Sequence, residues 1–257
     1  MSGRKVALVT GAAGGIGLAV VRGLGQQGTA VAAVDNDATA LEESTQKLIA
    51  EGLEVVPVLT DVRSPDEAEA AFDTVQARLG PVDQLVNAAG IMRPGKAWEL
   101  DEHAWEESLA VNATGVFTMS RAAARHMVPR SSGAIVTVAS NAAGTARTRF
   151  AAYCASKAAA AMYTKCLGLE LAEHGIRCNV VAPGSTDTPM LHSLWSDGSG
   201  PRATLDGDPE AFRVGIPLRR IASPDDVADS VVFLLSDRAA HITMHTLTVD
   251  GGATLGT

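Results

Sequence analysis

Basic residues, aromatic residues and cysteines are all scarce in this 257-residue sequence. Lysine and arginine number 21 against 29 aspartates and glutamates, and the resulting net charge of −8 argues against nucleic acid or an anionic membrane as the main partner. No apolar run reaches the length of a membrane span, and the N-terminus lacks the apolar core and cleavage pattern of a signal peptide. We therefore expect a cytoplasmic protein with neither a nucleic-acid nor a membrane partner.

The three cysteines, Cys154, Cys166 and Cys178, are odd in number and spaced by twelve residues. They form no C-x-x-C pair and cannot build a metal cluster alone, so we expect no metal site. The spacing places the first two on one helix and the third on the following strand. We interpret them as reduced thiols that fill small spaces in the core.

What the sequence does contain is an alternation of apolar runs and amphipathic stretches from end to end. The predicted strands are 6–9, 30–34, 55–59, 84–86, 134–138, 177–181 and 246–249. The predicted helices are 15–27, 38–50, 65–79, 104–127, 153–173 and 224–235. Strands that are apolar throughout, rather than alternating, favour a parallel sheet covered by helices on both faces. Without a linker or repeat, the sequence predicts a single α/β domain over residues 1–257 with a doubly wound sheet.

One segment, residues 184–217, interrupts this alternation. It is rich in Gly, Pro, Ser and Asp, with isolated apolar residues that include Met190, Leu191, Leu194 and Trp195. A loop of this length inside a compact domain is usually functional or disordered. Because these apolar residues could pack over a bound substrate, we predict that the segment forms a lid.

The first predicted strand runs into a glycine-rich turn, residues 10–17, and then into a helix. Gly11 permits a tight turn, while Gly15 and Gly17, on either side of Ile16, let a pyrophosphate and the helix approach closely. The N–H groups at the helix N-terminus would bind the phosphates. This position between strand and helix indicates a dinucleotide site, although the spacing G-x-x-x-G-x-G differs from the usual G-x-G-x-x-G.

The second predicted strand ends at Asp35, eighteen residues after Gly17. A carboxylate at this position accepts hydrogen bonds from the adenosine ribose and repels a 2′-phosphate. No Arg or Lys lies in the glycine turn or beside Asp35 in the sequence. The sequence therefore predicts NAD rather than NADP as the cofactor.

Two further strand ends carry residues that suit a dinucleotide. Asp61 and Val62 follow the third predicted strand and would cover the adenine. The fourth predicted strand ends in Asn87, Ala88 and, two residues later, Gly90. These small residues stand where the backbone must lie against the cofactor.

The stretch from Ser140 to Lys157 carries the candidate chemistry. Tyr153 and Lys157 are four residues apart, so on a helix their side chains share one face. A phenol is a poor base at neutral pH, but a neighbouring cation favours the phenolate, and we expect Lys157 to lower the pKa of Tyr153. Ser140 would hydrogen-bond the same substrate oxygen, which makes an acid–base site for an alcohol or a carbonyl.

These motifs occur together in the order and spacing of the short-chain dehydrogenase/reductase family, which the chain resembles over essentially its whole length. The matching residues are 10–17, 87–90, 153–157, 183–184, Asn112 and Ser140. The resemblance implies a seven-stranded Rossmann-like sheet. It also implies a homotetramer built on helices 104–127 and 153–173 and on the C-terminal strand.

The resemblance further implies roles for individual residues. The catalytic set would be Asn112, Ser140, Tyr153 and Lys157. Within it, Asn112 would bind a water that relays protons to Lys157, which would also hold the nicotinamide ribose. The nicotinamide end of the cofactor would lie against Tyr153, Lys157, Pro183, Gly184, Thr186 and Thr188.

A closer resemblance is carried by residues 85–95, 133–143, 177–190 and 241–256. It is to family members that oxidise a carboxylated cyclohexadiene alcohol to an aromatic product. The carboxylate of such a substrate favours a guanidinium, and Arg147 is the first candidate, followed by Arg93 and Arg149. The flat ring would be enclosed by Met190, Leu191 and Trp195.

Two positions depart from the pattern of those enzymes, because Gly144 replaces a histidine and Asn141 replaces an acidic residue. The ring substituent therefore stays open between a hydroxyl and an amino group. Three other interpretations compete: a family member acting on a sugar, steroid or acyl thioester, a non-enzymatic NAD sensor, and a structural protein. The intact acid–base set argues against a sensor, which has no need of it.

Overall fold

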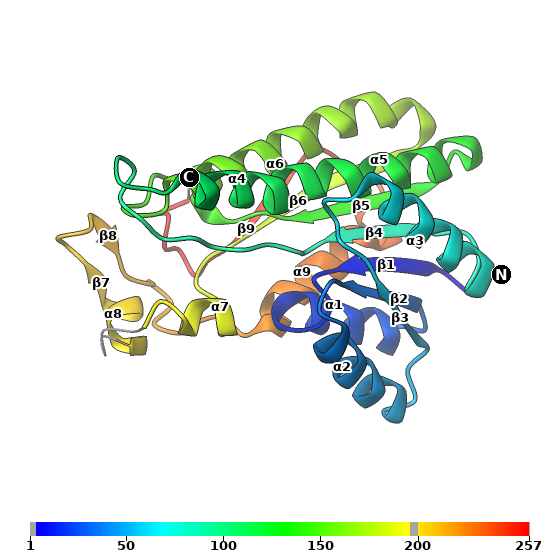
Figure 1. Cartoon of the computed structure of the whole chain (residues 1–257), viewed down its shortest axis with the longest axis horizontal. Helices are drawn as coiled ribbons and strands as arrows, with labels where there is room; N and C mark the ends of the chain where they lie inside the picture. Colours follow the sequence, from blue (N-terminus) through cyan, green and yellow to red (C-terminus); the bar gives the residue numbers. More distant parts are fainter. Residues whose placement is uncertain (1–3, 196–199, 257) are drawn as a thin grey trace.

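A seven-stranded parallel sheet forms the centre of the molecule (Figure 1). The computed structural model describes residues 4–195 and 200–256. Neighbouring strands are parallel throughout, in the order β3-β2-β1-β4-β5-β6-β9. The strands are β1 Val6–Thr10, β2 Ala30–Asp35, β3 Val55–Leu59, β4 Gln84–Asn87, β5 Gly133–Val138, β6 Ile176–Pro183 and β9 Thr246–Val249. The prediction of a doubly wound sheet of about seven strands is confirmed.

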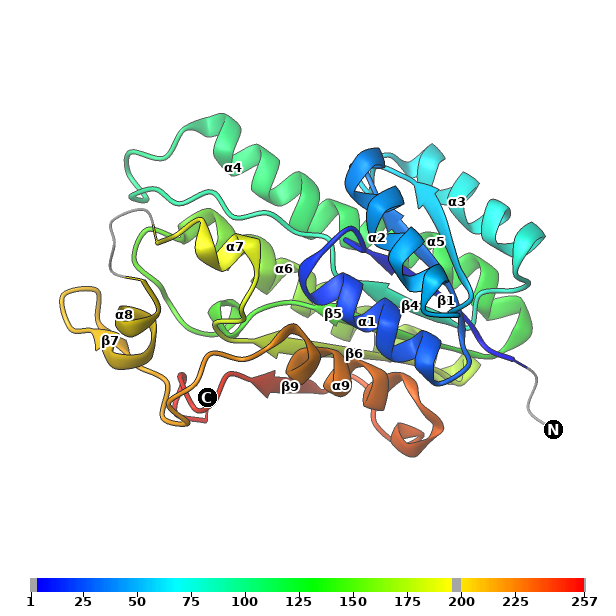
Figure 2. The same cartoon turned by 90° about the horizontal axis from the view of Figure 1, so that it is seen from below.

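Helices cover both faces of the sheet, and each face has its own apolar core (Figures 1 and 2). On one face α1, α2 and α9 pack around residues such as Leu24 and Val231. On the other, α3, α5 and α6 pack around Phe72, Met119 and Leu167. The helices are α1 Gly15–Gln26, α2 Ala38–Ala50, α3 Pro65–Arg78, α4 Glu102–Leu109, α5 Gly115–Met127, α6 Ala151–Leu171 and α9 Pro224–Leu235.

Local sequence explains where these elements begin. Strand β1 is buried at all five positions because its residues are apolar or, at Thr10, hydrogen-bonded. Helix α3 starts with Ser64 as its cap and Pro65 in its first turn. Helix α9 starts with a capping box in which Ser223 and Asp226 each accept a hydrogen bond from the other's backbone N–H. These caps satisfy N–H groups that have no partner inside the helix.

The predicted helix 104–127 consists of three consecutive segments. Between α4 and α5 lies a π-helical segment, Ala110–Thr114, which contains Asn112. A π-helical turn widens the helix and often marks a functional position. Here it coincides with Asn112, whose side chain is completely buried.

The segment 184–217 is more regular than the predicted loop. It contains α7 Pro189–His192, α8 Gly200–Asp206 and a small antiparallel hairpin of β7 Gly207–Asp208 with β8 Arg213–Val214. Figures 1 and 2 show these elements beyond the carboxyl ends of the central strands. The prediction missed the hairpin because its strands are only two residues long and Gly207 adopts a positive φ of 90°. Residues 196–199 of the predicted lid lie outside the described residues.

The cysteines lie in the predicted elements, Cys154 and Cys166 on α6 and Cys178 on β6. Cys178 is buried, but Cys166 is exposed, so the expectation that all three fill the core is wrong for Cys166. Across residues 4–195 and 200–256, we find no helix with the length and apolar character needed to cross a membrane.

Candidate active site

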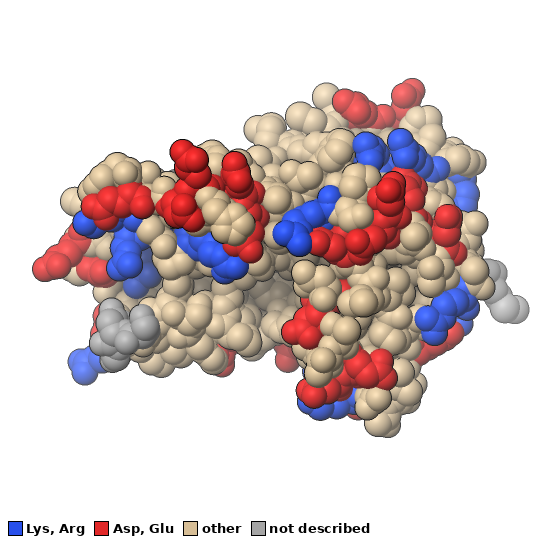
Figure 3. Space-filling view, viewed as in Figure 1, with Lys and Arg blue, Asp and Glu red and all other residues tan. Residues whose placement is uncertain are grey.

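Two adjoining hollows lie at the carboxyl edge of the sheet, where the strand order reverses between β1 and β4. We call the first the outer groove; it runs past the glycine turn, Asp35 and Asp61. The second, the inner pocket, is bordered by Ser140, Tyr153 and the segment around α7. The two hollows share the residues Ile16, Ala88, Gly90, Thr188 and Met190. In the view of Figure 3, the molecular surface has a hollow near its middle, and acidic and basic side chains surround this hollow.

The glycine turn at the outer groove has no space for larger side chains. Gly11 has a positive φ of 67°, and a β-carbon there would lie 2.7 Å from the backbone nitrogen of Ala89. A β-carbon on Gly17 would overlap the carbonyl oxygen of Gly11. The N-cap of α1 is Gly14, so among the described residues no side chain caps the N–H groups of the first helical turn. These groups are available to an anion.

Thr10, which the sequence analysis did not single out, connects this turn to β4. Its hydroxyl oxygen accepts hydrogen bonds from the backbone N–H groups of Ala88 and Ala89, at 3.0 and 3.2 Å. The only signal in the sequence was a hydroxyl residue directly before Gly11. The contact holds the glycine turn and the end of β4 together as the two walls of the outer groove.

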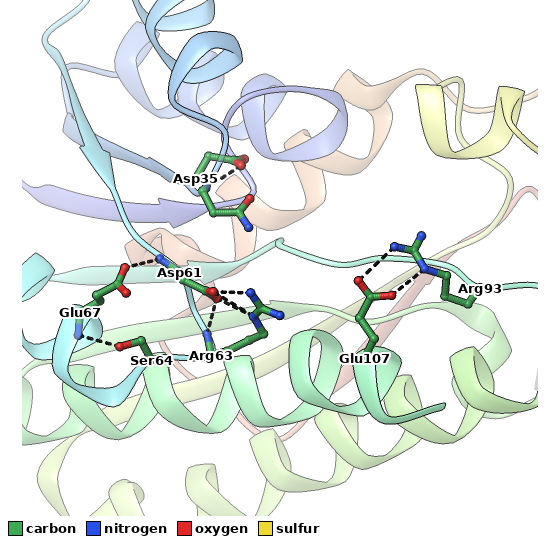
Figure 4. Close-up of polar contacts among 8 residues, drawn as sticks. Asp35, Asp61, Arg63, Ser64, Glu67, Arg93 and Glu107 are labelled. Atoms are coloured by element: carbon green, nitrogen blue, oxygen red, sulfur yellow. Dashed lines mark hydrogen bonds and ion pairs between the residues drawn. The ribbon is translucent and has the colours of Figure 1, made fainter. Parts of the chain in front are cut away.

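Asp35 stands at the end of β2 and faces the outer groove. Its Oδ2 accepts a hydrogen bond from the Ala13 N–H at 3.0 Å, and its Oδ1 accepts one from the Asn36 N–H at 2.8 Å. Figure 4 shows this carboxylate above the Asp61 region. Through its bond to Ala13, the Asp35 carboxylate connects the glycine turn to the end of β2.

The fold brings two arginines into the outer groove, and both are paired (Figure 4). The Arg63 guanidinium binds Asp61, with Nη2 2.6 Å from Oδ2, and this hydrogen bonding lowers the pKa of Asp61. Arg93 binds Glu107, with Nε 2.7 Å from Oε2. The sequence analysis considered only the sequence neighbours of Asp35 and therefore did not select Arg63, which reaches the same groove from the turn after β3. Arg93 lies in the outer groove and is not among the residues that line the inner pocket.

The residues at the end of β4 face two directions, some toward the core and others toward the outer groove. The Asn87 side chain points into the core, where its Nδ2 donates to the hydroxyls of Ser120 and Thr137 at 2.9 and 3.3 Å. Ala88 and Gly90 line the outer groove, as does Val62, which follows β3. Asn87 therefore supports the wall from behind, and its small neighbours form the surface.

Tyr153 and Ser140 line the inner pocket together with Lys157. All three are buried, with exposed fractions of 7%, 8% and 4%. Burial raises the pKa of Tyr153, and a hydrogen bond with Ser140 opposes this rise. The expectation that Lys157 lowers the pKa of the phenol is wrong in this structure, because burial dominates.

The ammonium group of Lys157 is hydrogen-bonded to the backbone and lies over the Tyr153 ring. Its Nζ donates to the Val138 carbonyl at 2.9 Å and lies 5.9 Å from the centre of the Tyr153 ring. Burial lowers the pKa of Lys157 from 10.5 to about 8. The i, i+4 spacing does bring both side chains to the same pocket, as α6 predicts.

The side-chain amide of Asn112, which lies close to Lys157, is held in place by three hydrogen bonds. Its Oδ1 accepts from the Ile91 N–H at 2.8 Å, and its Nδ2 donates to the Ile91 carbonyl at 2.9 Å and to the Ser156 hydroxyl at 3.0 Å. Both amide hydrogens are thus committed, and Oδ1 keeps one lone pair. A β-carbon on Gly90 would lie 3.1 Å from Lys157 Nζ and 3.2 Å from Asn112 Oδ1, so the groove wall, Lys157 and Asn112 are in close contact.

The inner pocket is lined by cationic, polar and apolar side chains. Arg147 reaches it from the loop before α6, and Arg213 from β8. Arg149 is exposed and borders a different hollow beside Trp98. The predicted nicotinamide and ring contacts that line the pocket are Pro183, Gly184, Thr186, Thr188, Met190 and Leu191.

Trp195 stands outside the described lining of the inner pocket. Its ring centre lies 4.6 Å from that of His192, and its Nε1 donates to the Thr204 hydroxyl at 3.2 Å. Leu194 of the predicted lid lines the pocket instead, together with Thr204 and Arg213, which the sequence analysis did not select. No periodic pattern marked them, because they come from short irregular elements.

Comparison with known proteins identifies the family. The family model for short chain dehydrogenases matches residues 5–199. The chain belongs to the short-chain dehydrogenase family. The 2,3-dihydro-2,3-dihydroxybenzoate dehydrogenase of Bacillus subtilis is 53% identical over 98% of this chain and 97% of its own length. The vibriobactin-specific 2,3-dihydro-2,3-dihydroxybenzoate dehydrogenase of Vibrio cholerae is 41% identical over 96% and 95%.

A solved structure shares the architecture of this short-chain dehydrogenase. It is the crystal structure of a variant of actinorhodin polyketide ketoreductase with NADPH, which superposes with a TM-score of 0.90 at 36% identity over 97% of both chains. Dehydrogenases of this family use nicotinamide cofactors. The outer groove fits such a dinucleotide, because Gly14 and Gly15 line it without a β-carbon and the start of α1 offers N–H groups.

Proposed function

We propose that this short-chain dehydrogenase oxidises 2,3-dihydro-2,3-dihydroxybenzoate to 2,3-dihydroxybenzoate with NAD, in siderophore or related secondary-metabolite synthesis. The observation that carries the proposal is the charge of the inner pocket. Arg147, Arg213 and Lys157 line it, and none of its described lining residues is an aspartate or glutamate. A pocket with this balance favours an anionic substrate, and a guanidinium matches a carboxylate geometrically. Both relatives are named for 2,3-dihydro-2,3-dihydroxybenzoate, and this supports a dihydroxylated ring as the part of the substrate that carries the carboxylate.

The proposed reaction removes a hydride from the carbinol carbon and a proton from its hydroxyl. Bound NAD supplies the hydride acceptor. Tyr153, as the phenolate, takes the hydroxyl proton, while Ser140 hydrogen-bonds the same oxygen. Lys157 passes the proton toward a water, and the remaining lone pair of Asn112 Oδ1 accepts a hydrogen bond from that water. The ketone then tautomerises to the catechol, and the gain of aromaticity draws the reaction forward.

We also infer that the segment 184–217 acts as a lid. Its described residues Met190, Leu191, Leu194 and Arg213 line the inner pocket, which is consistent with a cover over the substrate. Closing this cover would exclude water while the hydride is transferred.

The preference for NAD is proposed from the acidic end of the outer groove. Asp35 would accept hydrogen bonds from the ribose hydroxyls and repel a 2′-phosphate. Asp61 would neutralise Arg63, the cation in this groove that the sequence analysis missed. This arrangement supports NAD even though the ketoreductase structure contains NADPH.

Replacing Asp35 by alanine is expected to lower the NAD-to-NADP ratio of kcat/KM at least about tenfold, since removing like-charge repulsion of about 1.4 kcal/mol corresponds to that factor. Initial rates with both cofactors measure it. Asp37→Asn is the matched control, because Asp37 lies two residues away and caps α2. Equal use of NADP by the unmodified protein would contradict the assignment of Asp35.

Replacing Arg147 by alanine is expected to raise the KM for a carboxylated substrate by roughly 10- to 100-fold with little change in kcat, since hydrogen bonds to charged groups contribute about 1.5–3 kcal/mol. Steady-state kinetics at saturating NAD measure both constants. Arg149→Ala is the control from the same loop, because Arg149 is exposed and borders another hollow. An unchanged KM in the Arg147 variant would remove this residue from the substrate site.

The competing substrate is trans-2,3-dihydro-3-hydroxyanthranilate, which carries an amine in place of one hydroxyl. An ammonium group would favour a carboxylate neighbour, and the described lining of the inner pocket offers none. The deciding experiment incubates the protein with NAD and each compound and follows NADH and the aromatic product. Turnover of the amine alone, or of neither compound, would overturn the proposed substrate.

We infer a cytoplasmic homotetramer as the working form. Phe117 on α5 and Met162 and Leu169 on α6 are apolar side chains with exposed fractions of 40%, 60% and 68%. Their position on the outer faces of adjacent helices is consistent with burial between subunits.

A further inference from the structure

Arg213 is the charged residue of the inner pocket that neither the sequence analysis nor the family motifs selected. It lies on β8 of the small hairpin, whereas Arg147 lies in the loop before α6. The two guanidinium groups act on each other: the pKa of Arg147 is lowered first by burial and then by the positive charge of Arg213. Two separate parts of the chain therefore direct like charges into one partly buried space.

Within the described part of the chain, neither Arg147 nor Arg213 forms an ion pair. Arg213 Nη2 donates to the Ala203 carbonyl at a long 3.4 Å, and its Nε is buried with no hydrogen-bond partner among the described residues. Nearby arginines behave differently, since Arg202 and Arg219 both bind Asp206. A buried donor without a partner and a neighbouring like charge are both costly, unless an anion binds there.

The carboxylates beside the two arginines are engaged by other groups. Asp208, opposite Arg213 in the hairpin, accepts hydrogen bonds from the backbone N–H groups of Glu210 and Ala211 at 3.1 and 3.2 Å. Asp250 acts electrostatically on Arg147, but its oxygens accept hydrogen bonds from Asn141, Gly252 and Thr254. It is also not among the described residues that line the inner pocket. The two guanidinium groups therefore remain available to a ligand.

The hairpin that carries Arg213 is held firmly at its base. Ile216 N–H donates to the Leu205 carbonyl at 2.9 Å, and Arg219 binds Asp206 at 2.6 Å. A β-carbon on Gly207 would lie 2.5 Å from the backbone nitrogen of Gly215, so the strands approach closely. This packing positions the guanidinium in advance and lowers the entropic cost of binding.

We propose that Arg213 is a second substrate-binding residue, which binds the substrate carboxylate jointly with Arg147. The proposal rests on the proposed function, because it assigns the carboxylate of that substrate to a pair of cations. One guanidinium comes from the body of the protein and the other from the segment 184–217. A carboxylated ring therefore joins this segment to the loop before α6, and a ring without a carboxylate does not.

Binding of two probe ligands in the presence of NADH tests this assignment. The probes are 2,3-dihydroxybenzoate and catechol, which differ only in the carboxylate, and calorimetry gives both dissociation constants. In Arg213→Gln and Arg213→Met we expect the preference for the carboxylated ligand to fall at least about tenfold, with catechol affinity unchanged. Arg213→Lys should restore part of the preference, and Arg202→Met, at an arginine whose side chain is 93% exposed, should change nothing.

The outcomes distinguish this inference from the proposed function. An unchanged preference in the Arg213 variants, or equal weakening of both ligands, would overturn the role of Arg213. Equal binding of the two probes by the unmodified protein would overturn it as well. A retained, Arg213-dependent preference in a protein that fails to oxidise the proposed cyclohexadiene would overturn only the proposed reaction.

Discussion

Replacement of Tyr153 by phenylalanine is expected to lower the rate of alcohol oxidation by about 10²- to 10⁴-fold, the usual contribution of a positioned acid–base group. The ring would keep its packing, because Tyr153 is buried beside Ser140 and loses only its hydroxyl. We therefore expect NADH affinity, measured by fluorescence titration, to stay close to that of the unmodified protein. Loss of turnover together with intact cofactor binding identifies the phenol as the base.

Tyr163 provides the matched control, since it is the other of the two tyrosines and lies on the same helix. Its ring packs edge-on against Phe117, with centres 5.6 Å apart, and burial raises its pKa to about 12. Tyr163→Phe should retain nearly full activity. Near-normal turnover in Tyr153→Phe would transfer the role of base to another group.

The pH dependence gives an independent test of the same base. Burial raises the pKa of Tyr153, so the phenol is protonated at neutral pH and the reactive phenolate becomes more abundant as the pH increases. We expect kcat/KM for oxidation to increase with pH through the alkaline range. The residual activity of Tyr153→Phe should lack this increase, and an identical profile in both proteins would contradict the assignment.

Replacement of Gly17 by alanine is expected to destabilise the protein by about 3 kcal/mol, at the upper end of the cost of overpacking. A β-carbon there would overlap the Gly11 carbonyl oxygen, which is backbone and cannot rotate away. The turn would have to shift from β4, and we expect NADH affinity to fall at least about tenfold. Denaturant unfolding and fluorescence titration measure the two effects.

Gly14→Ala is the control for this substitution. Gly14 lies in the same turn, has an extended φ of −173°, and has no heavy atom within 4 Å of the β-carbon position. We expect little change in stability, as measured by denaturant unfolding. Similar losses in both variants would mean that the turn is sensitive to any side chain, rather than to the contact between Gly17 and Gly11.

Predictions from the sequence were most successful where a local rule applies. The strands were identified because buried parallel strands are apolar on both faces, as β1 and β2 show. The helical repeat correctly predicted that Tyr153 and Lys157 reach one pocket. The glycine turn was identified by its place between a strand and a helix, and it lines the outer groove. The hairpin of β7 and β8 was missed because two-residue strands leave no periodic pattern.

Contacts between distant segments could not be predicted from local rules. Arg63 is close in sequence to Asp61 but distant from Asp35, and only the sheet brings all three to one groove. The raised pKa of Tyr153 also depends on burial by several elements, which the spacing of Tyr153 and Lys157 does not reveal. Asn87 appeared suited to the cofactor, yet its amide is bound by Ser120 and Thr137.

The sequence by itself determined the fold class, the dinucleotide turn and the spacing of the acid–base residues, because each depends on neighbours within one or two elements. The tertiary structure alone decided which arginines meet at the inner pocket, since Arg147 and Arg213 come from separate segments. It also decided the charge states of buried groups, because desolvation depends on all the elements that enclose them.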